Sequence, residues 1–234
     1  MLFVLINRKQ VGFHKNIASC APRFFSRRCY IVTFSVPHNK DFFNFSVDTG
    51  RVLFAGSRSI TIPRQTCNDL IYQFGRLGFA FLTGCAKGVD ESFRHALAES
   101  DFKDTSIVAC SFRDRADRLK GVYPLYVVPD GLTPKVALAK RTLWITARCS
   151  LLILFPSMPI GRPQPLFPKE LGKGSALAFK SAIYNNKPVF VVTSTRPAES
   201  DLYSVYPSSL FGVIDGYWCV PPVYQDTGLC YEIL

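Results

Sequence analysis

Hydrophobic and polar positions alternate in regular blocks along most of the chain. From residue 51 onward, short apolar runs are separated by stretches in which apolar residues recur every three or four positions. The first pattern is typical of buried strands and the second of amphipathic helices. Strands are predicted at 51–55, 79–83, 106–110, 150–155 and 188–192, with a short extra one near 123–128. Helices are predicted between them, beginning near Pro63, Val89, Pro134 and Gly174.

Strands that alternate with helices predict an α/β fold of the Rossmann-like, doubly wound type, with a mainly parallel sheet and helices on both faces. We expect a basic N-terminal extension at 1–50, with an added strand near 29–35. A Rossmann-like domain at 51–193 follows, and 194–234 are expected to form a cap or tail. Within the domain, the Pro-rich loop 156–168 is predicted to lack regular structure.

One predicted helix carries a basic pair whose direction depends on the helix face. If its apolar positions face the core, Lys140 and Arg141 point away from it, towards solvent or the edge of a ligand. The apolar positions are Val136, Ala139, Leu143 and Ala147.

The net charge of +11 would indicate a polyanionic partner, but it is unevenly distributed. Residues 1–40 hold seven basic residues and no acidic one, so the remainder carries a net charge of only +4. Segment 1–40 resembles an organellar transit peptide in composition; a variable extension is the preferred alternative. We therefore expect a cytoplasmic protein, with an organellar location as the alternative. No apolar run reaches the roughly 18 residues of a membrane span, so no membrane partner is expected.

The eight cysteines show no C-x-x-C pair and no metal-ligand spacing with the three histidines. This pattern predicts a reducing compartment and no metal site. Cys67 and Cys110 lie within apolar patterns and are predicted to be small buried side chains.

Glycine-bearing turns follow three of the predicted strands. They are Gly56-Ser57-Arg58, the segment Thr83-Gly84-Cys85-Ala86-Lys87-Gly88-Val89-Asp90, and Gly172-Lys173-Gly174-Ser175. The carboxyl ends of parallel strands meet at one edge of a sheet, where ligands bind. Backbone N–H groups at a helix N-terminus favour anions there. Neither a Walker A loop nor G-x-G-x-x-G is present, so the turns indicate a phosphate-bearing ligand of unspecified kind.

Several side chains at these turns admit two roles. Lys87 can supply a charge to a phosphate, and Arg58 faces either a ligand or solvent. Asp90 is expected to cap its helix, the commoner role, or to bind a ribose hydroxyl. His95 is expected on a helix surface, because no nucleophile accompanies it.

These motifs together resemble those of the DprA/Smf family of DNA-processing proteins. Gly56-Ser57-Arg58 is similar to the family's G-S-R, and Thr83–Asp90 to its S-G-x-A-x-G-I-D. Lys140-Arg141-Thr142 resembles its R-N-R segment, with Thr142 in place of Asn. Segments 174–178 and 187–192 resemble its G-S-x-x-T-A and R-P-V-x-x-V.

The resemblance implies a Rossmann-like domain of the SLOG superfamily that binds single-stranded DNA through a basic pocket at the strand ends, without catalysis. The residues assigned to phosphate or nucleotide binding are Gly56, Ser57, Arg58, Thr83, Gly84, Lys87, Gly88, Val89, Asp90, Lys140, Arg141, Gly174 and Ser175.

The catalytic Glu of the related LOG phosphoribohydrolases corresponds to Ala178, which disfavours that hydrolysis. We therefore expect a nucleic-acid-binding protein without a cofactor, acting in DNA processing or recombination. The alternative is a sensor or enzyme for a small nucleotide derivative. Association as a homodimer is left open.

Overall fold

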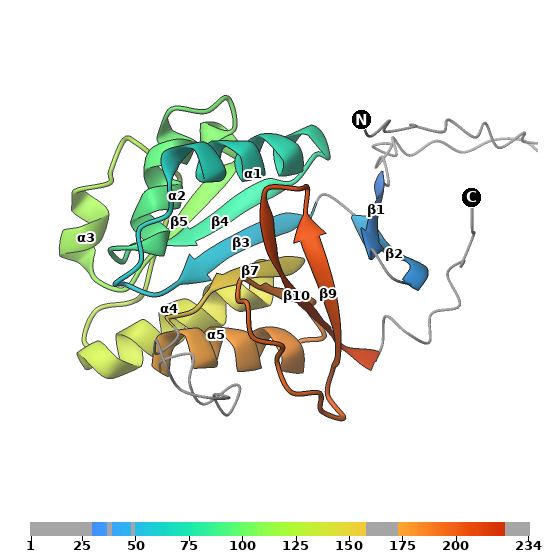
Figure 1. The fold of residues 1–234 in the computed structure, drawn as a ribbon. Helices are drawn as coiled ribbons and strands as arrows, with labels where there is room; N and C mark the ends of the chain where they lie inside the picture. Colours follow the sequence, from blue (N-terminus) through green and yellow to red (C-terminus); the bar gives the residue numbers. More distant parts are fainter. Residues whose placement is uncertain (1–29, 37–38, 48–49, 158–172, 223–234) are drawn as a thin grey trace, which may run out of the picture.

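The computed structural model describes residues 30–36, 39–47, 50–157 and 173–222. Its main sheet has the strand order β6-β5-β4-β3-β7-β8-β10-β9 (Figure 1). The strands are β3 (Arg51–Gly56), β4 (Ala80–Gly84), β5 (Ser106–Cys110), β6 (Leu125–Val127), β7 (Leu151–Phe155), β8 (Val189–Val191), β9 (Ser204–Leu210) and β10 (Ile214–Val220). The strands from β6 to β8 in this order pair in parallel, whereas β10 is antiparallel to both β8 and β9. The predicted α/β fold with a mainly parallel sheet is confirmed.

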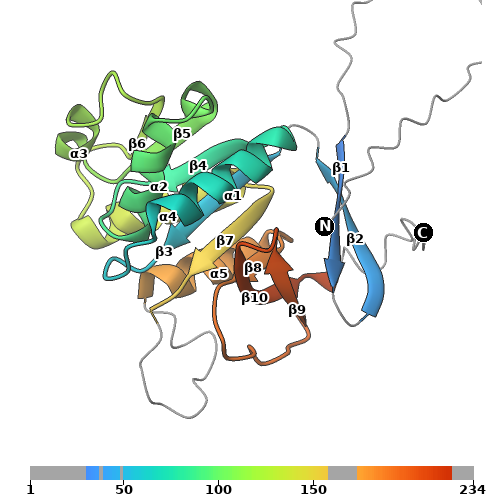
Figure 2. The ribbon, with the colours of Figure 1, turned by 45° about the horizontal axis from the view of Figure 1, so that its top comes forward.

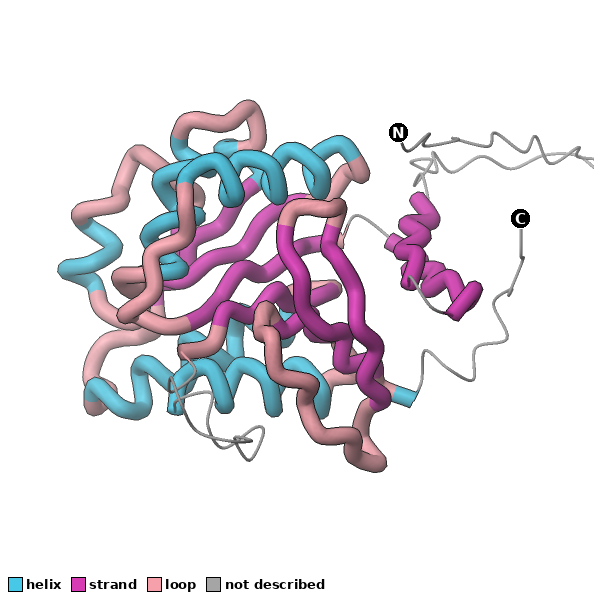
Figure 3. The backbone as a smooth tube through the Cα atoms, viewed as in Figure 1, coloured by secondary structure: helices cyan, strands magenta, loops and turns pink. Residues whose placement is uncertain are grey.

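Helices cover both faces of the sheet (Figure 3). The helices α1 (Arg64–Arg76) and α2 (Val89–Ala98) lie on one face, and α4 (Pro134–Arg148) and α5 (Lys173–Tyr184) lie on the other. The short helices η1 (Lys103–Thr105) and α3 (Arg113–Asp117) stand in the connections around β5. None of the helices in these described ranges has the length and hydropathy of a membrane-spanning segment.

The core has two halves because successive strand residues point to opposite faces. In β3, Val52 and Phe54 pack towards α1 and α2, while Leu53 packs towards α4 and α5. Phe54 stacks on Phe93 of α2, with ring centroids 3.9 Å apart. This strand is buried on both sides, which is why its sequence is apolar at successive positions.

The inward face of α4 differs from the predicted one. Val136 and Leu143 are 42% and 47% exposed, and the buried side chains include Thr142 and Thr146. Thr146 Oγ1 hydrogen-bonds to the carbonyl of Thr142 at 2.9 Å and lies 2.6 Å from Ser181 Oγ of α5. Because these hydroxyls find partners, they are buried at little cost, and a helix face that looks polar in sequence becomes the packed one.

The C-terminal part also departs from expectation. We predicted a cap or tail from residue 194, but within this part 204–220 form β9 and β10, a hairpin that extends the sheet itself. Trp218 of β10 is 1% exposed and packs edge-on against Phe190 of β8. The hairpin therefore shares the hydrophobic core of the domain.

A second, two-stranded antiparallel sheet precedes the domain. It consists of β1 (Tyr30–Val36) and β2 (Asn39–Val47) and lies beside the main sheet in Figure 2. The strand expected near 29–35 agrees with β1 to within a residue. Most of the loop expected at 156–168 lies outside the described residues, as do residues 1–29.

Candidate functional site

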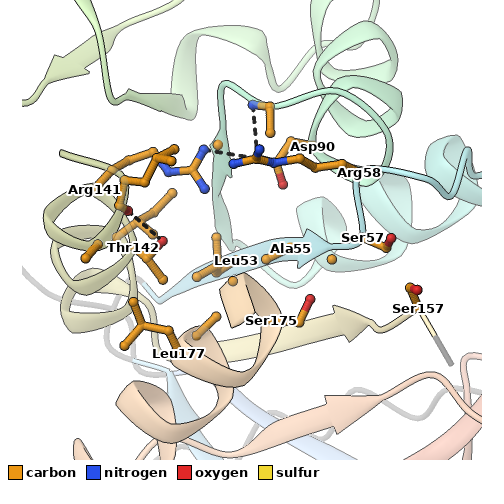
Figure 4. A pocket seen from close by; sticks show the side chains of 18 of the residues that line it. Leu53, Ala55, Ser57, Arg58, Asp90, Arg141, Thr142, Ser157, Ser175 and Leu177 are labelled. Atoms are coloured by element: carbon orange, nitrogen blue, oxygen red, sulfur yellow. Dashed lines mark hydrogen bonds and ion pairs between the residues drawn. The ribbon is translucent and has the colours of Figure 1, made fainter. Parts of the chain in front are cut away.

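A cavity of about 720 Å³ lies at the carboxyl ends of β3 and β4, between these strands, α4 and the start of α5 (Figure 4). It is at the edge of the sheet where the sequence predicts a ligand. Eight residues that were predicted to bind phosphate or nucleotide line it: Gly56, Ser57, Arg58, Gly84, Asp90, Arg141, Gly174 and Ser175.

Five predicted residues do not line the cavity. Lys87 and Lys140 are exposed and lie outside its lining. Thr83 and Val89 are fully buried, and Gly88 lies behind the turn that carries Arg58. The tertiary structure thus separates these basic residues from Arg58 and Arg141, which it brings together.

Lys135 lines the cavity although sequence reasoning did not select it. It directly follows Pro134, the first residue of α4. A helix that follows a parallel strand begins at the carboxyl edge of the sheet, so a basic residue beside such a proline is a signal that could have identified it.

The turn after β3 is held by backbone hydrogen bonds. Ser57 N–H donates to the Phe155 carbonyl at 2.9 Å, and the Ser57 carbonyl accepts the Val89 N–H at 3.1 Å. A side chain at Gly56 would collide with the Phe155 carbonyl. These contacts fix the turn between β7 and α2 and leave the exposed Arg58 at the mouth of the cavity.

Gly88 allows this turn to lie against the start of α2. Its φ is +73°, a region that favours glycine, and a Cβ there would lie 2.5 Å from the Ser57 carbonyl oxygen. The same Cβ would lie 2.7 Å from backbone atoms of Arg58. The glycine is therefore required by the close approach of two backbone segments.

Asp90 and Arg141 form a buried ion pair at the back of the cavity. Arg141 Nη1 lies 3.4 Å from Asp90 Oδ2, and the two side chains are 13% and 6% exposed. The Ala86 N–H also donates to Asp90 Oδ2, at 3.2 Å. Burial raises the pKa of Asp90, and the Arg141 guanidinium opposes this rise. Gly84 has no room for a side chain because this carboxylate and guanidinium occupy the space beside it.

The capping role expected of Asp90 is not the one it has. Gly88 occupies the N-cap position of α2, and no side chain makes a capping hydrogen bond there. The Asp90 carboxylate instead turns back to the Ala86 N–H and to Arg141. Asp90 and Arg141 lie in different helices, α2 and α4. Their contact therefore cannot be predicted from the sequence alone.

Arg94 supports the same turn from below and was missed by sequence reasoning. Its Nη1 donates to the carbonyls of Gly84 and Ala86 at 2.6 and 2.9 Å. Arg94 is 7% exposed. In sequence, a basic residue within an amphipathic helix is expected on the surface. Only the tertiary structure shows that Arg94 binds the backbone of the turn at Gly84 and Ala86. His95, in contrast, is exposed on α2 as predicted.

The start of α5 completes the site. Gly174 and Ser175 line the cavity within the first turn of α5, which begins at Lys173. The first N–H groups of a helix have no partner within the helix and carry a partial positive charge. With Arg58, Lys135 and Arg141, the described lining presents three cationic side chains against one carboxylate, Asp90, which is already paired. This arrangement suits an anionic ligand.

Among solved structures, two that are similar to this chain are DNA processing protein A from Helicobacter pylori and the same protein from Streptococcus pneumoniae. Both are DprA proteins. The first match covers 66% of this chain and 69% of the other, with 18% identity and a TM-score of 0.47. The second covers 64% of this chain and 52% of the S. pneumoniae protein, with 19% identity and a TM-score of 0.43. The H. pylori structure was described for its single-stranded DNA binding mode.

No protein-family model and no curated protein matches the sequence.

Proposed function

We propose that this protein binds single-stranded DNA through phosphate groups at the carboxyl edge of its sheet, in DNA processing or recombination. The observation that carries the proposal is the convergence of Arg58, Lys135, Arg141 and the N-terminus of α5 on one cavity. Guanidinium and ammonium groups and helix N–H groups are the phosphate ligands that proteins use. The resemblance of the motifs to the DprA/Smf family supports DNA as the polyanion.

The three cationic residues differ in whether an acidic side chain of the protein already neutralises their charge. Arg141 is paired with Asp90, so its positive charge is largely balanced inside the protein. No acidic partner is described for Arg58 or Lys135, and both side chains are exposed. We therefore assign the phosphate contacts first to Arg58 and Lys135, and a supporting role to Arg141.

The wall of the cavity favours binding over catalysis. Ala178, at the position of the LOG glutamate, is 3% exposed and contributes a methyl group to the lining. Asp90 is the only carboxylate in the described lining, and its Oδ2 atom is held by Arg141 and Ala86. A carboxylate with those partners is poorly placed to transfer a proton to a ligand.

A nucleotide derivative is a second candidate, favoured by the shape of the site. A cavity of about 720 Å³ lies within the range of about 300 to 1,000 Å³ that is usual for small-molecule sites. Apolar side chains such as Leu138, Ile145 and Leu177 line it beside the cationic groups. Such a surface suits a base or sugar next to a phosphate.

Salt dependence of binding tests the first candidate. For single strands, the logarithm of affinity falls with the logarithm of salt with a slope of about −0.7 per phosphate contact. A labelled oligothymidylate is titrated at 50 and 200 mM salt and followed by fluorescence anisotropy. Removing one contact by Arg58→Ala should reduce the slope by about 0.7, which is about a 2.6-fold smaller loss of affinity over this fourfold change in salt.

Arg76→Ala is the matched control. Arg76 is an exposed arginine in the last turn of α1, outside the cavity lining. Its removal takes away the same charge and should leave the slope unchanged. Equal slopes for the two variants, or binding that does not respond to salt, would refute phosphate binding at this site. A mononucleotide can also be added as a competitor of the labelled oligonucleotide. If it displaces the oligonucleotide at a concentration well below that of the oligonucleotide phosphates, the second candidate, a nucleotide derivative, is favoured.

A further inference from the structure

Cys85 and Cys110 lie side by side at the ends of two neighbouring strands. Strands β4 and β5 are parallel, with Gly84 opposite Ala109, so the next pair in this register is Cys85 and Cys110. Both side chains pack in the half of the core beneath α1 and α2, which places both sulfur atoms on the same face of the sheet.

Two arginines from other elements reach the Cys85 sulfur. Arg115 Nη1 of α3 lies 3.7 Å from Cys85 Sγ, and Arg141 Nη1 of α4 lies 3.8 Å from it. Cys85 is 8% exposed, whereas Cys110 is fully buried. Cationic groups beside a cysteine sulfur favour the thiolate.

The surroundings of the pair shift the pKa values of Cys85 and Cys110 in opposite directions. The interaction with Cys110, with the two guanidinium groups, lowers the pKa of Cys85 in spite of burial. The same interaction and burial raise the pKa of Cys110. Asp90 near Cys85 acts in the opposite sense to the arginines, and Arg94 faces Cys110. The Cys85 sulfur is therefore the one of the pair that is favoured as a thiolate.

The other described cysteines lack such surroundings. Cys67, Cys149 and Cys219 are buried as free thiols, and burial raises the pKa of Cys67 and of Cys149 to about 12. Burial raises the pKa of Cys219 as well. They serve as internal controls, because they are the same side chain and burial dominates the pKa of each one.

We propose that Cys85 and Cys110 form an oxidisable dithiol, which a hydroperoxide converts into an intramolecular disulfide. Strands in a sheet are about 4.8 Å apart, which is within the range of about 4.4 to 6.8 Å between the Cα atoms of a disulfide. Because Cys85 and Cys110 directly follow the paired residues Gly84 and Ala109, we expect a bridge between them to need no large movement of the backbone. The proposal does not depend on which ligand the cavity binds, although Arg141 contacts both the Cys85 sulfur and the cavity.

The reaction balances in two steps. The Cys85 thiolate attacks one oxygen of the hydroperoxide, the O–O bond breaks, and the leaving oxygen takes up a proton to depart as water or an alcohol. The Cys110 sulfur then attacks the resulting sulfenic acid, the S–O bond breaks, and the Cys110 proton leaves with the hydroxide as water. Two thiols lose two electrons and two protons, and the peroxide is reduced.

Peptide mapping of the full chain tests this proposal. Cys20, Cys29 and Cys230 are replaced by serine, so that thiols outside the described residues do not react. The protein is treated with an equimolar amount of hydrogen peroxide, its free thiols are blocked with iodoacetamide, and it is digested with trypsin without reduction. We expect peptide 77–87, which contains Cys85, linked to peptide 104–113, which contains Cys110. The linked mass should be two hydrogens below the sum of the two peptides.

Two further measurements keep the test decisive. Cys110→Ser should stop the reaction at the Cys85 sulfenic acid, which dimedone traps. If this variant does not fold, the test rests on the linked peptides 77–87 and 104–113 from the chain that keeps Cys110. The initial rate of peroxide reaction at Cys85 should change little between pH 6 and 8, whereas an ordinary thiol reacts about tenfold faster per pH unit in this range. If both peptides keep free thiols, or if Cys85 reacts no faster than Cys67, the proposal is overturned.

Discussion

Replacement of Gly88 by alanine tests whether the site depends on the close approach of the Arg58 turn to α2. Two costs add. The first is the positive φ of +73°, which costs an L-residue about 1 to 2 kcal/mol. The second is steric, because the new Cβ would lie 2.5 Å from the Ser57 carbonyl oxygen and 2.7 Å from backbone atoms of Arg58. These neighbours are backbone, so they cannot rotate away as a flexible side chain does.

The magnitude of the steric term follows from the distance that has to be gained. Ordinary contact begins near 3.4 Å, so the turn has to move away from α2 by almost an ångström. The hydrogen bond from Val89 N–H to the Ser57 carbonyl, now 3.1 Å, would then be lost or weakened. Overpacking costs about 1 to 3 kcal/mol and the hydrogen bond about 1 kcal/mol. We expect Gly88→Ala to lower the free energy of unfolding by about 3 to 6 kcal/mol.

Gly121→Ala is the matched control for the backbone term. Gly121 also has a positive φ, of +80°, but a Cβ there would meet nothing within 4 Å. It should cost only about 1 to 2 kcal/mol. Urea unfolding of the wild type and of both variants gives the free energies of unfolding to be compared, provided that the three proteins have the same slope m. Unfolding free energies that differ by less than about 0.5 kcal/mol between the variants would refute the steric argument.

Two other predictions concern the cationic groups of the cavity. Arg141→Met leaves Asp90 buried without its partner and should lower the free energy of unfolding by about 3 kcal/mol at pH 7. Burial already raises the pKa of Asp90, and loss of the guanidinium raises it further. A carboxyl with a raised folded-state pKa stabilises the protein below its unfolded pKa and loses that contribution as pH rises, so the deficit should shrink from pH 7 to pH 5 in urea unfolding. A deficit that is the same at both pH values would contradict the ion pair. Lys135→Ala should reduce the salt slope of oligothymidylate binding by about 0.7, whereas Lys180→Ala, on the exposed side of α5, should leave it unchanged. The same slope for both lysine variants in the anisotropy titration would remove Lys135 from the site.

The sequence by itself determined the order of strands and helices from β3 to β8 along the chain and the edge of the sheet where the cavity lies. Local periodicity carries this information, because alternation and helical spacing are properties of neighbouring residues. The turns at Gly56–Arg58 and Gly84–Asp90 were predicted to meet there, and the structure places both at the cavity. The glycines mark these turns because backbone segments and the Asp90–Arg141 pair approach where a side chain would stand.

Only the tertiary structure decided which side chains reach the cavity. The rotation of α4 depends on packing against α5, where hydroxyls of Thr146 and Ser181 meet at 2.6 Å, and this rotation turns Arg141 inward and Lys140 outward. The hairpin at 204–220 joined the sheet instead of covering it, because a strand pairs wherever an open edge is available. That Cys85 and Cys110 directly follow a paired position depends on the register of two strands with a helix between them in the sequence. Such relations arise from contacts between elements, and no local pattern of residues encodes them.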